Sequence, residues 1–167
     1  SALHLSLVLS KVEQGTEVIT QSLNFVAGCN AISYCKAKPV FLDVDSESLS
    51  LSPASLELFL ENKCEIRNDG LCWNKDTGNR VSACLPMNTY GFSCDSKKLN
   101  TLCKKYNIPL VEDSAESLGS FYQKKHTGSE SLMSAISFNG NKIITTGGGG
   151  IILTNNKLLC DKARHLS

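Results

Sequence analysis

The sequence predicts an α/β fold, a three-layer α/β/α arrangement built around a mostly parallel, mixed sheet. Short apolar runs that suit buried strands alternate with amphipathic stretches that suit helices, a pattern typical of a parallel sheet with helices on both faces. The apolar runs 135–138 and 150–154 follow each other with no helix between them, so one strand is expected to be antiparallel. With 167 residues and no internal repeat, the chain has about the length of one domain.

The individual elements are predicted from periodicity, from apolar runs and from the residues that begin and end helices. Helices are expected at 3–11, 24–35, 54–62 and 95–106, with another that includes 163–167, and strands at 17–20, 39–42, 82–87, 108–112, 135–138 and 150–154. Gly15 lies past the first helix, where glycine commonly ends a helix. Ser52 and Pro53 suit the start of the third helix, and Asp95 suits the cap of the fourth. The polar, turn-rich segment 64–78 predicts an excursion or a small hairpin.

The overall composition is ordinary and argues against two classes of partner. The net charge is +1 and 20% of the residues are charged, so no basic field points to nucleic acid. No apolar run approaches the roughly 20 residues of a membrane span, and no signal peptide opens the chain. We therefore expect a cytoplasmic protein without nucleic-acid or membrane partners. Both ends fall inside helical patterns, so the chain is expected to be part of a larger protein.

The cysteines and histidines do not predict a metal site. None of the eight cysteines forms a CxxC pair, and four of them lie in apolar patterns: Cys29, Cys35, Cys84 and Cys160. This pattern favours buried thiols over a disulfide framework or a metal site. The histidines His4, His126 and His165 show no spacing typical of metal ligands.

Two charged residues are placed where the strands of such a sheet end. Asp113 follows the apolar run 108–112, and Lys142 lies in the loop that follows the run 135–138. Ligands of open α/β sheets bind beyond the carboxyl ends of the strands, so Asp113, Asn88 and the loop 137–142 are expected on one side. A carboxylate that holds a heterocyclic cation and a lysine that forms a Schiff base are what pyridoxal 5′-phosphate (PLP) chemistry needs. The alternatives are a helix cap for Asp113, with a helix starting near Ser114, and a solvated surface position for Lys142.

Three further features fit the same kind of site. The small residues on both sides of Lys142, including the run 147–150, indicate close backbone approach to a ligand. The Ser137 hydroxyl can donate to a phosphate, or it can bond locally at the end of its strand. The Phe25 ring can stack on a flat cofactor, or it can belong to the core.

These motifs resemble the DegT/StrS type of PLP-dependent nucleotide-sugar aminotransferase, within the fold-type I aminotransferase superfamily. The resemblance rests on EDSAESLGS (112–120), SFNGNK (137–142), TTGGGG (145–150) and EVITQSLNFVAGCNAISY (17–34) followed by KPVFLDVD (38–45). It covers nearly the whole chain and is most specific over 111–150. SFNGNK in place of the commoner SFHPTK, together with the segment 65–80, is similar to a subgroup that acts in bacillosamine, legionaminic-acid or related amino-sugar pathways.

The resemblance implies a role for each matching residue. Lys142 would bond covalently to PLP and shuttle the proton between cofactor and substrate, and Asp113 would form a salt bridge with the pyridinium nitrogen. Phe25 would stack on the ring, and Ser137 would bind the phosphate. Glu116 stands where many relatives have a Gln that contacts the edge of the cofactor.

Three other positions match less completely. Ser1 and Ala2 match the end of the family's phosphate-binding turn, whose preceding half lies outside this sequence. Asn88 replaces a His that is frequent in relatives, so the resemblance implies no role for it. The resemblance implies that residues 1–167 are a partial fold-type I PLP-binding large domain, without the N-terminal arm and the C-terminal small domain.

The implied reaction is transamination of a UDP-linked 4-keto-6-deoxy sugar with glutamate as amino donor, giving a 4-amino sugar for surface glycans, in a homodimer. One alternative is a dehydratase of the same family, but related dehydratases replace the lysine with histidine, so Lys142 argues against it. Another is a truncated, non-catalytic paralogue or fragment that acts as a binding module. A dinucleotide-binding domain is excluded because no glycine fingerprint follows the first strand.

Overall fold

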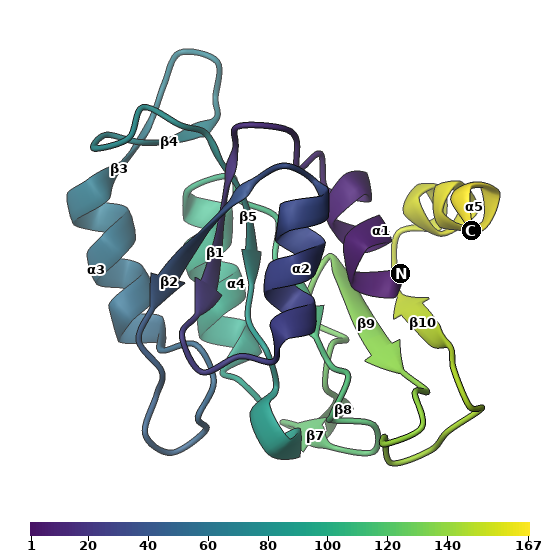
Figure 1. Cartoon of the computed structure of the whole chain (residues 1–167). Helices are drawn as coiled ribbons and strands as arrows, with labels where there is room; N and C mark the ends of the chain where they lie inside the picture. The colour runs from purple at the N-terminus through teal and green to yellow at the C-terminus, as the bar shows by residue number, and fades with distance from the viewer.

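The computed structural model describes residues 1–167, and its helices and strands alternate along the chain as predicted (Figure 1). The helices are α1 (Ala2–Leu9), α2 (Val26–Tyr34), α3 (Pro53–Lys63), α4 (Ser96–Lys105) and α5 (Lys157–Leu166), with a short 3₁₀ helix, η1 (Thr89–Gly91). The strands are β1 (Glu17–Gln21), β2 (Lys38–Leu42), β3 (Cys64–Ile66), β4 (Cys72–Asn74), β5 (Val81–Leu85), β6 (Val111–Asp113), β7 (Phe121–Tyr122), β8 (Lys125–His126), β9 (Met133–Ser137) and β10 (Gly150–Leu153).

The main sheet is mixed and mostly parallel, as the sequence predicted. Strands β2, β1 and β5 pair in parallel in that order, and β6 pairs in parallel with β9. Parallel bridges between Cys84 and Leu110 and between Met87 and Asp113 connect these two groups. Strand β10 is the antiparallel member and pairs with β9. The carboxyl ends of β1, β5, β6 and β9 therefore lie on one side of the sheet, where ligands of such sheets bind.

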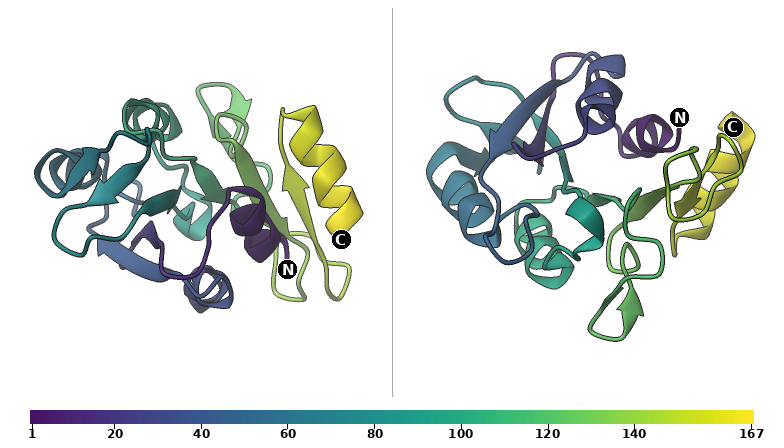
Figure 2. Two further views of the ribbon diagram at one scale, coloured as in Figure 1. Left: turned by 90° about the horizontal axis from the view of Figure 1, so that it is seen from above. Right: turned by 60° about the horizontal axis from the view of Figure 1, so that its bottom comes forward.

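Helices cover both faces of the sheet, which gives the three predicted layers (Figure 2). One core joins α3 and α4 to residues on one face of the strands, such as Ile19, Cys84 and Leu110. The other joins α1 and α2 to their neighbours on the opposite face, such as Val18 and Ala83. Side chains of successive strand residues point to opposite faces, and this alternation separates the two cores.

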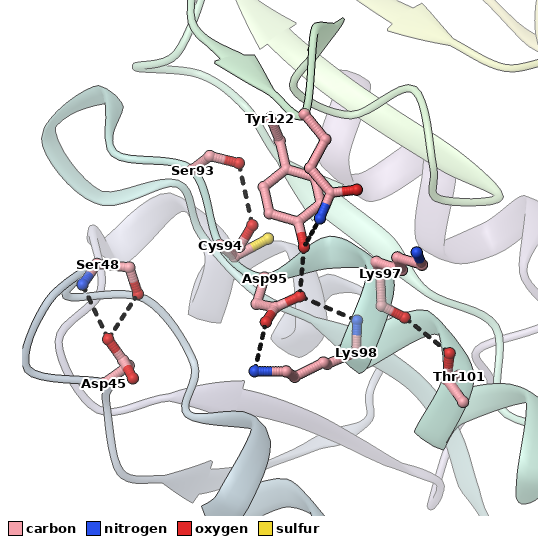
Figure 3. Close-up of polar contacts among 10 residues, drawn as sticks. Asp45, Ser48, Ser93, Cys94, Asp95, Lys97, Lys98, Thr101 and Tyr122 are labelled. Carbon is pink, nitrogen blue, oxygen red and sulfur yellow. Dashed lines mark hydrogen bonds and ion pairs between the residues drawn. The ribbon is translucent and has the colours of Figure 1, made fainter.

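The predicted caps begin α3 and α4. The Ser52 side chain accepts a hydrogen bond from the Ser55 N–H (3.3 Å), and Asp95 Oδ1 accepts one from the Lys98 N–H (3.1 Å). Asp95 Oδ1 also accepts a hydrogen bond from the Tyr122 hydroxyl (2.6 Å), so the cap of α4 anchors the β7–β8 hairpin (Figure 3). The polar segment 64–78 contains the β3–β4 hairpin, as expected.

Several expectations are corrected in detail. Strand β6 begins at Val111 rather than at residue 108 and includes Asp113, and β5 ends at Leu85 rather than at residue 87. Cys29, Cys35 and Cys160 are only partly buried, although all eight cysteines are free thiols. The expectation that these three thiols are buried is wrong, because α2 and α5 each expose apolar positions to solvent.

No helix has the length and apolar character that crossing a membrane requires.

Candidate functional site

An open cleft of about 1610 Å³ lies between α1, the start of α2 and the strands β9 and β10. The elements that frame it lie side by side in Figures 1 and 2. Six residues predicted for the site line this cleft: Ser1, Ala2, Phe25, Asp113, Ser137 and Lys142. The structure therefore brings together residues that are widely separated in the sequence, because the carboxyl ends of the parallel strands meet at one edge.

The Lys142 side chain is enclosed rather than solvated. Only 11% of it is exposed, and its Nζ lies 3.5 Å from Glu116 Oε1 and 5.5 Å from the centroid of the Phe25 ring. The interpretation of Lys142 as an ordinary surface lysine is therefore wrong. The Glu116 carboxylate and the face of the Phe25 ring both attract the Lys142 side chain, so they restrict where its amine can lie.

Asp113 ends β6 with its carboxylate directed into the cleft. The residue is 3% exposed, and Oδ1 accepts a hydrogen bond from the Ala115 N–H (3.1 Å). Burial raises the pKa of Asp113 to about 6, while the Ala115 N–H and the Lys142 charge act in the opposite direction. No helix begins at Ser114, where the chain forms turns, so the helix-cap interpretation of Asp113 is also wrong.

Phe25 and Ser137 lie at the rim of the cleft. Phe25 is the residue before α2, and 53% of it is exposed, so it does not belong to the core. Ser137 is the last residue of β9, and its Oγ accepts a hydrogen bond from the Asn139 N–H (3.2 Å). The Ser137 hydroxyl hydrogen is thus left to donate to a ligand.

Ser1 and Ala2 place the start of α1 at the cleft. Ser1 is the N-cap residue of α1, and its side chain makes no cap hydrogen bond. The first N–H groups of the helix have no partner within the helix, and they carry the positive end of its dipole. This end of the cleft can therefore accept an anionic group such as a phosphate.

Glu116 is held in place by a residue that the sequence did not single out. Glu116 Oε2 accepts a hydrogen bond from the Tyr90 N–H (2.9 Å) while Oε1 faces Lys142. Tyr90 has φ 54°, an uncommon conformation for a residue that is not glycine. The next residue, Gly91 (φ +86°), approaches so closely that a Cβ there would lie 3.1 Å from the Glu116 carbonyl oxygen. The Tyr-Gly pair before Phe92 was the available signal for this turn.

The sequence also did not predict a role for Asn88 or Glu112. Both residues are fully buried, and Asn88 Nδ2 donates to Glu112 Oε2 (3.2 Å) beside the site. The available signal was Glu112 itself, a carboxylate within an apolar strand. A carboxylate is rarely fully buried without hydrogen-bond partners, so its position indicated a buried polar network.

The arrangement combines the parts that a cofactor with a cationic ring and a phosphate would need. Asp113 supplies a buried negative charge, Phe25 supplies a flat apolar surface, and Ser137 with the start of α1 supplies donors for an anion. Lys142 supplies an enclosed primary amine and lines the same cleft. No group of three or more His, Cys, Asp or Glu side chains is arranged to hold a metal ion.

Known proteins are similar to this chain in sequence and in fold. Residues 1–167 match the DegT/DnrJ/EryC1/StrS aminotransferase family. EpsN of Bacillus subtilis (strain 168), provisionally named a pyridoxal phosphate-dependent aminotransferase, is 40% identical over 167 residues, which cover 100% of this chain and 40% of EpsN. GDP-perosamine synthase of Escherichia coli O157:H7 is 37% identical over 164 residues, covering 98% of this chain and 40% of that enzyme.

The crystal structure of a DegT DnrJ EryC1 StrS aminotransferase from Brucella abortus has a TM-score of 0.86 at 25% identity, over 98% of this chain and 41% of that one. The fold is that of the fold-type I PLP-dependent aminotransferases. The chain spans about 40% of the length of the curated relatives that it matches. Because the family match extends over all of its residues, the chain belongs to the DegT/DnrJ/EryC1/StrS aminotransferase family.

Proposed function

We propose that this protein is a PLP-dependent aminotransferase that converts the 4-keto group of a UDP-linked 6-deoxy sugar to an amine, with glutamate as amino donor. The observation that carries the proposal is the enclosed Lys142 amine, which lies between the Glu116 carboxylate and the Phe25 ring at the Asp113 cleft. Membership of the family and the similarity to a GDP-perosamine synthase support a nucleotide-sugar substrate. The product would be a 4-amino sugar for surface glycan biosynthesis.

The residues of the cleft fit PLP. Asp113 is a buried carboxylate, and burial disfavours its charged form. The protonated ring nitrogen of PLP would neutralise that negative charge. Ser137, Ser1 and Ala2 would hold the phosphate, and Phe25 would cover one face of the ring. When bound, PLP supplies the electron sink that makes the carbon–hydrogen bond beside the reacting nitrogen acidic.

The side chains of the cleft would bind and orient the cofactor and would move the proton. Asp113 would keep the ring nitrogen of bound PLP protonated, because an opposite charge stabilises the cation. With PLP bound, Lys142 Nζ would act as the general base and acid that moves the proton between the substrate carbon and the cofactor. Glu116 Oε1 holds the Lys142 amine in direction, and the Tyr90 N–H fixes the Glu116 carboxylate.

We further propose that residues 1–167 form part of the large domain of a cytoplasmic homodimer, with an N-terminal arm and a C-terminal small domain in the remaining sequence. The share of the relatives' length that this chain covers supports this proposal. The free thiols are consistent with a reducing compartment.

The test is covalent capture of PLP by Lys142. We expect the purified protein with PLP to show an absorbance band near ~420 nm that borohydride converts into a stable adduct at Lys142, located by peptide mass spectrometry. Lys142→Ala should lose the band and the adduct. Lys157→Ala is the matched control, because the side chain of Lys157 is 87% exposed in a surface ion pair.

Two outcomes of this experiment would contradict the proposal. The absence of a lysine-dependent adduct in the intact protein would refute it and favour the non-catalytic interpretation. An adduct that survives in Lys142→Ala would show that another lysine reacts.

A further inference from the structure

A buried polar network lies behind the candidate site and does not contact the cleft. Its centre is Asn88, which is fully buried just after β5. Asn88 Nδ2 donates to Glu112 Oε2 (3.2 Å) and to Ser114 Oγ (3.1 Å), and Asn88 Oδ1 accepts from the Cys94 N–H (2.8 Å). Every polar atom of the Asn88 side chain is therefore used within the protein.

Glu112 connects this network to the loop before β9. Its Oε2 also accepts a hydrogen bond from the Gly128 N–H (3.0 Å), while its Oε1 has no hydrogen-bond partner. Burial raises the pKa of Glu112, and the hydrogen bonds from Asn88 and Gly128 oppose that rise. Glu112 thus binds two segments of chain without a balancing cation.

Gly128 shows how tightly these segments are joined. Its φ is +84°, and a Cβ at this position would lie 2.2 Å from Ser134 Oγ and 2.5 Å from Ser134 Cβ. Ser134 in turn donates to Ser114 Oγ (2.8 Å). The loop before β9, the strand β9 and the turn after β6 are therefore locked together.

The network is connected to the site through the backbone. Glu112 and Asp113 are neighbours in β6, so their side chains point to opposite faces of the sheet. The Asn88 N–H donates to the Asp113 carbonyl oxygen (2.9 Å), which fixes the end of β6 against the segment after β5. Two residues after Asn88, the Tyr90 N–H donates a hydrogen bond to the Glu116 carboxylate, which faces Lys142.

We propose that Asn88 and Glu112 are positioning residues that set the places of Asp113 and Glu116 around Lys142. They touch neither the cleft nor a ligand and act only through the segments that they join. The inference rests on the proposed PLP chemistry, because its consequences are read at the bound cofactor.

The first test compares two substitutions of Glu112 in the intact protein. Glu112→Met has a similar volume but leaves the Asn88 and Gly128 donors without an acceptor, whereas Glu112→Gln keeps an acceptor for both. We expect Glu112→Met to raise the dissociation constant of PLP about tenfold, because Asp113 and Glu116 would shift from their places around Lys142. It should also shift the pH midpoint of the Lys142-dependent absorbance band, because Glu116 moves. Glu112→Gln should recover most of both properties.

The second test uses a milder pair of variants in case Glu112→Met does not fold. Ser134→Ala removes one hydroxyl from the network, and Ser82→Ala removes one buried hydroxyl that bonds to Thr16 and Glu17 away from the site. We expect similar losses of melting temperature in both variants, but an increase of about threefold in the PLP dissociation constant only in Ser134→Ala.

The outcomes separate this inference from the proposed function. If the wild type binds PLP through Lys142 and affinity falls only in proportion to stability in all variants, the network is merely structural and the inference is wrong. If the wild type forms no Lys142 adduct, the proposed function itself fails, and with it this inference.

Discussion

The Asp113 carboxylate is 3% exposed, and its one hydrogen bond within the protein comes from the Ala115 N–H. Burial raises its pKa to about 6, so the residue destabilises the folded protein wherever it is charged. Natural proteins often tolerate such a cost at sites where a ligand supplies the missing charge. At the scale of single residues, the cost of burying Asp113 therefore supports the proposed role of its carboxylate in binding a cationic group.

This burial predicts a definite pH dependence. The pKa of the folded state lies above the ordinary value of 3.8, so the folded protein binds the proton more tightly. The protonated form of Asp113 contributes to the free energy of unfolding, and this contribution is fully present below about pH 4. It is lost as the pH rises through about 6, and the total change is about 3 kcal/mol at most. We expect Asp113→Asn, without cofactor, to be more stable than the wild type at pH 7 and equally stable near pH 4. Thermal melts across this range test the expectation, and a constant difference would contradict it.

Glu116 affects Asp113 as well as Lys142. Its negative charge raises the pKa of Asp113, although burial is the larger cause. Glu116→Gln keeps an acceptor for the Tyr90 N–H but removes the charge. We expect the pKa of Asp113 to fall in this variant, measured by the pH titration of its ¹³C carboxyl resonance. Glu57→Gln on the exposed surface of α3 is the control and should leave the titration unchanged.

At the scale of elements, the loop before β9 depends on Gly128, where a side chain would be both strained and crowded. Gly128 combines a positive φ with close contact to Ser134, and Gly119 has a similar φ (+87°) but no atom within 4 Å of its added Cβ. The two positions therefore separate backbone strain from crowding.

We expect Gly119→Ala to lower the free energy of unfolding by about 1 kcal/mol, the cost of a left-handed alanine. Gly128→Ala should cost about 3 kcal/mol or more, because overpacking adds to the same strain. Denaturant titration of both variants measures the difference. Equal losses would show that the chain around Gly128 adjusts freely and that Ser134 does not hold it.

At the scale of the whole molecule, the thiols report which parts of the fold are closed. Cys64, Cys72, Cys84, Cys94 and Cys103 are buried, and the other three are partly exposed. Burial raises the pKa of the Cys94 thiol well above its ordinary value, which lowers its reactivity further. We expect no more than three of these eight thiols to react with Ellman's reagent in the folded protein at pH 8, and all eight of them in guanidinium. Rapid reaction of a fourth thiol under native conditions would contradict the described core.

Much of the fold was predictable because its signals are local. The caps at Ser52 and Asp95 and the alternation of strand and helix act within a few residues, and the structure confirms them. The ends of strands were less predictable. Asp113 belongs to β6, although the predicted strand ended at residue 112, because pairing with Ala135 and Met87 decides where the strand ends.

The sequence by itself determined the kind of fold through its alternating strands and helices, and its motifs indicated the family that the comparison confirms. It also predicted six of the residues that line the cleft. Only the tertiary structure decided that Lys142 is enclosed, that Phe25 lies at the rim of the cleft and that Asn88 and Glu112 share a buried network. These features depend on contacts between segments far apart in the chain. Burial and hydrogen bonding arise only when the sheet brings those segments together.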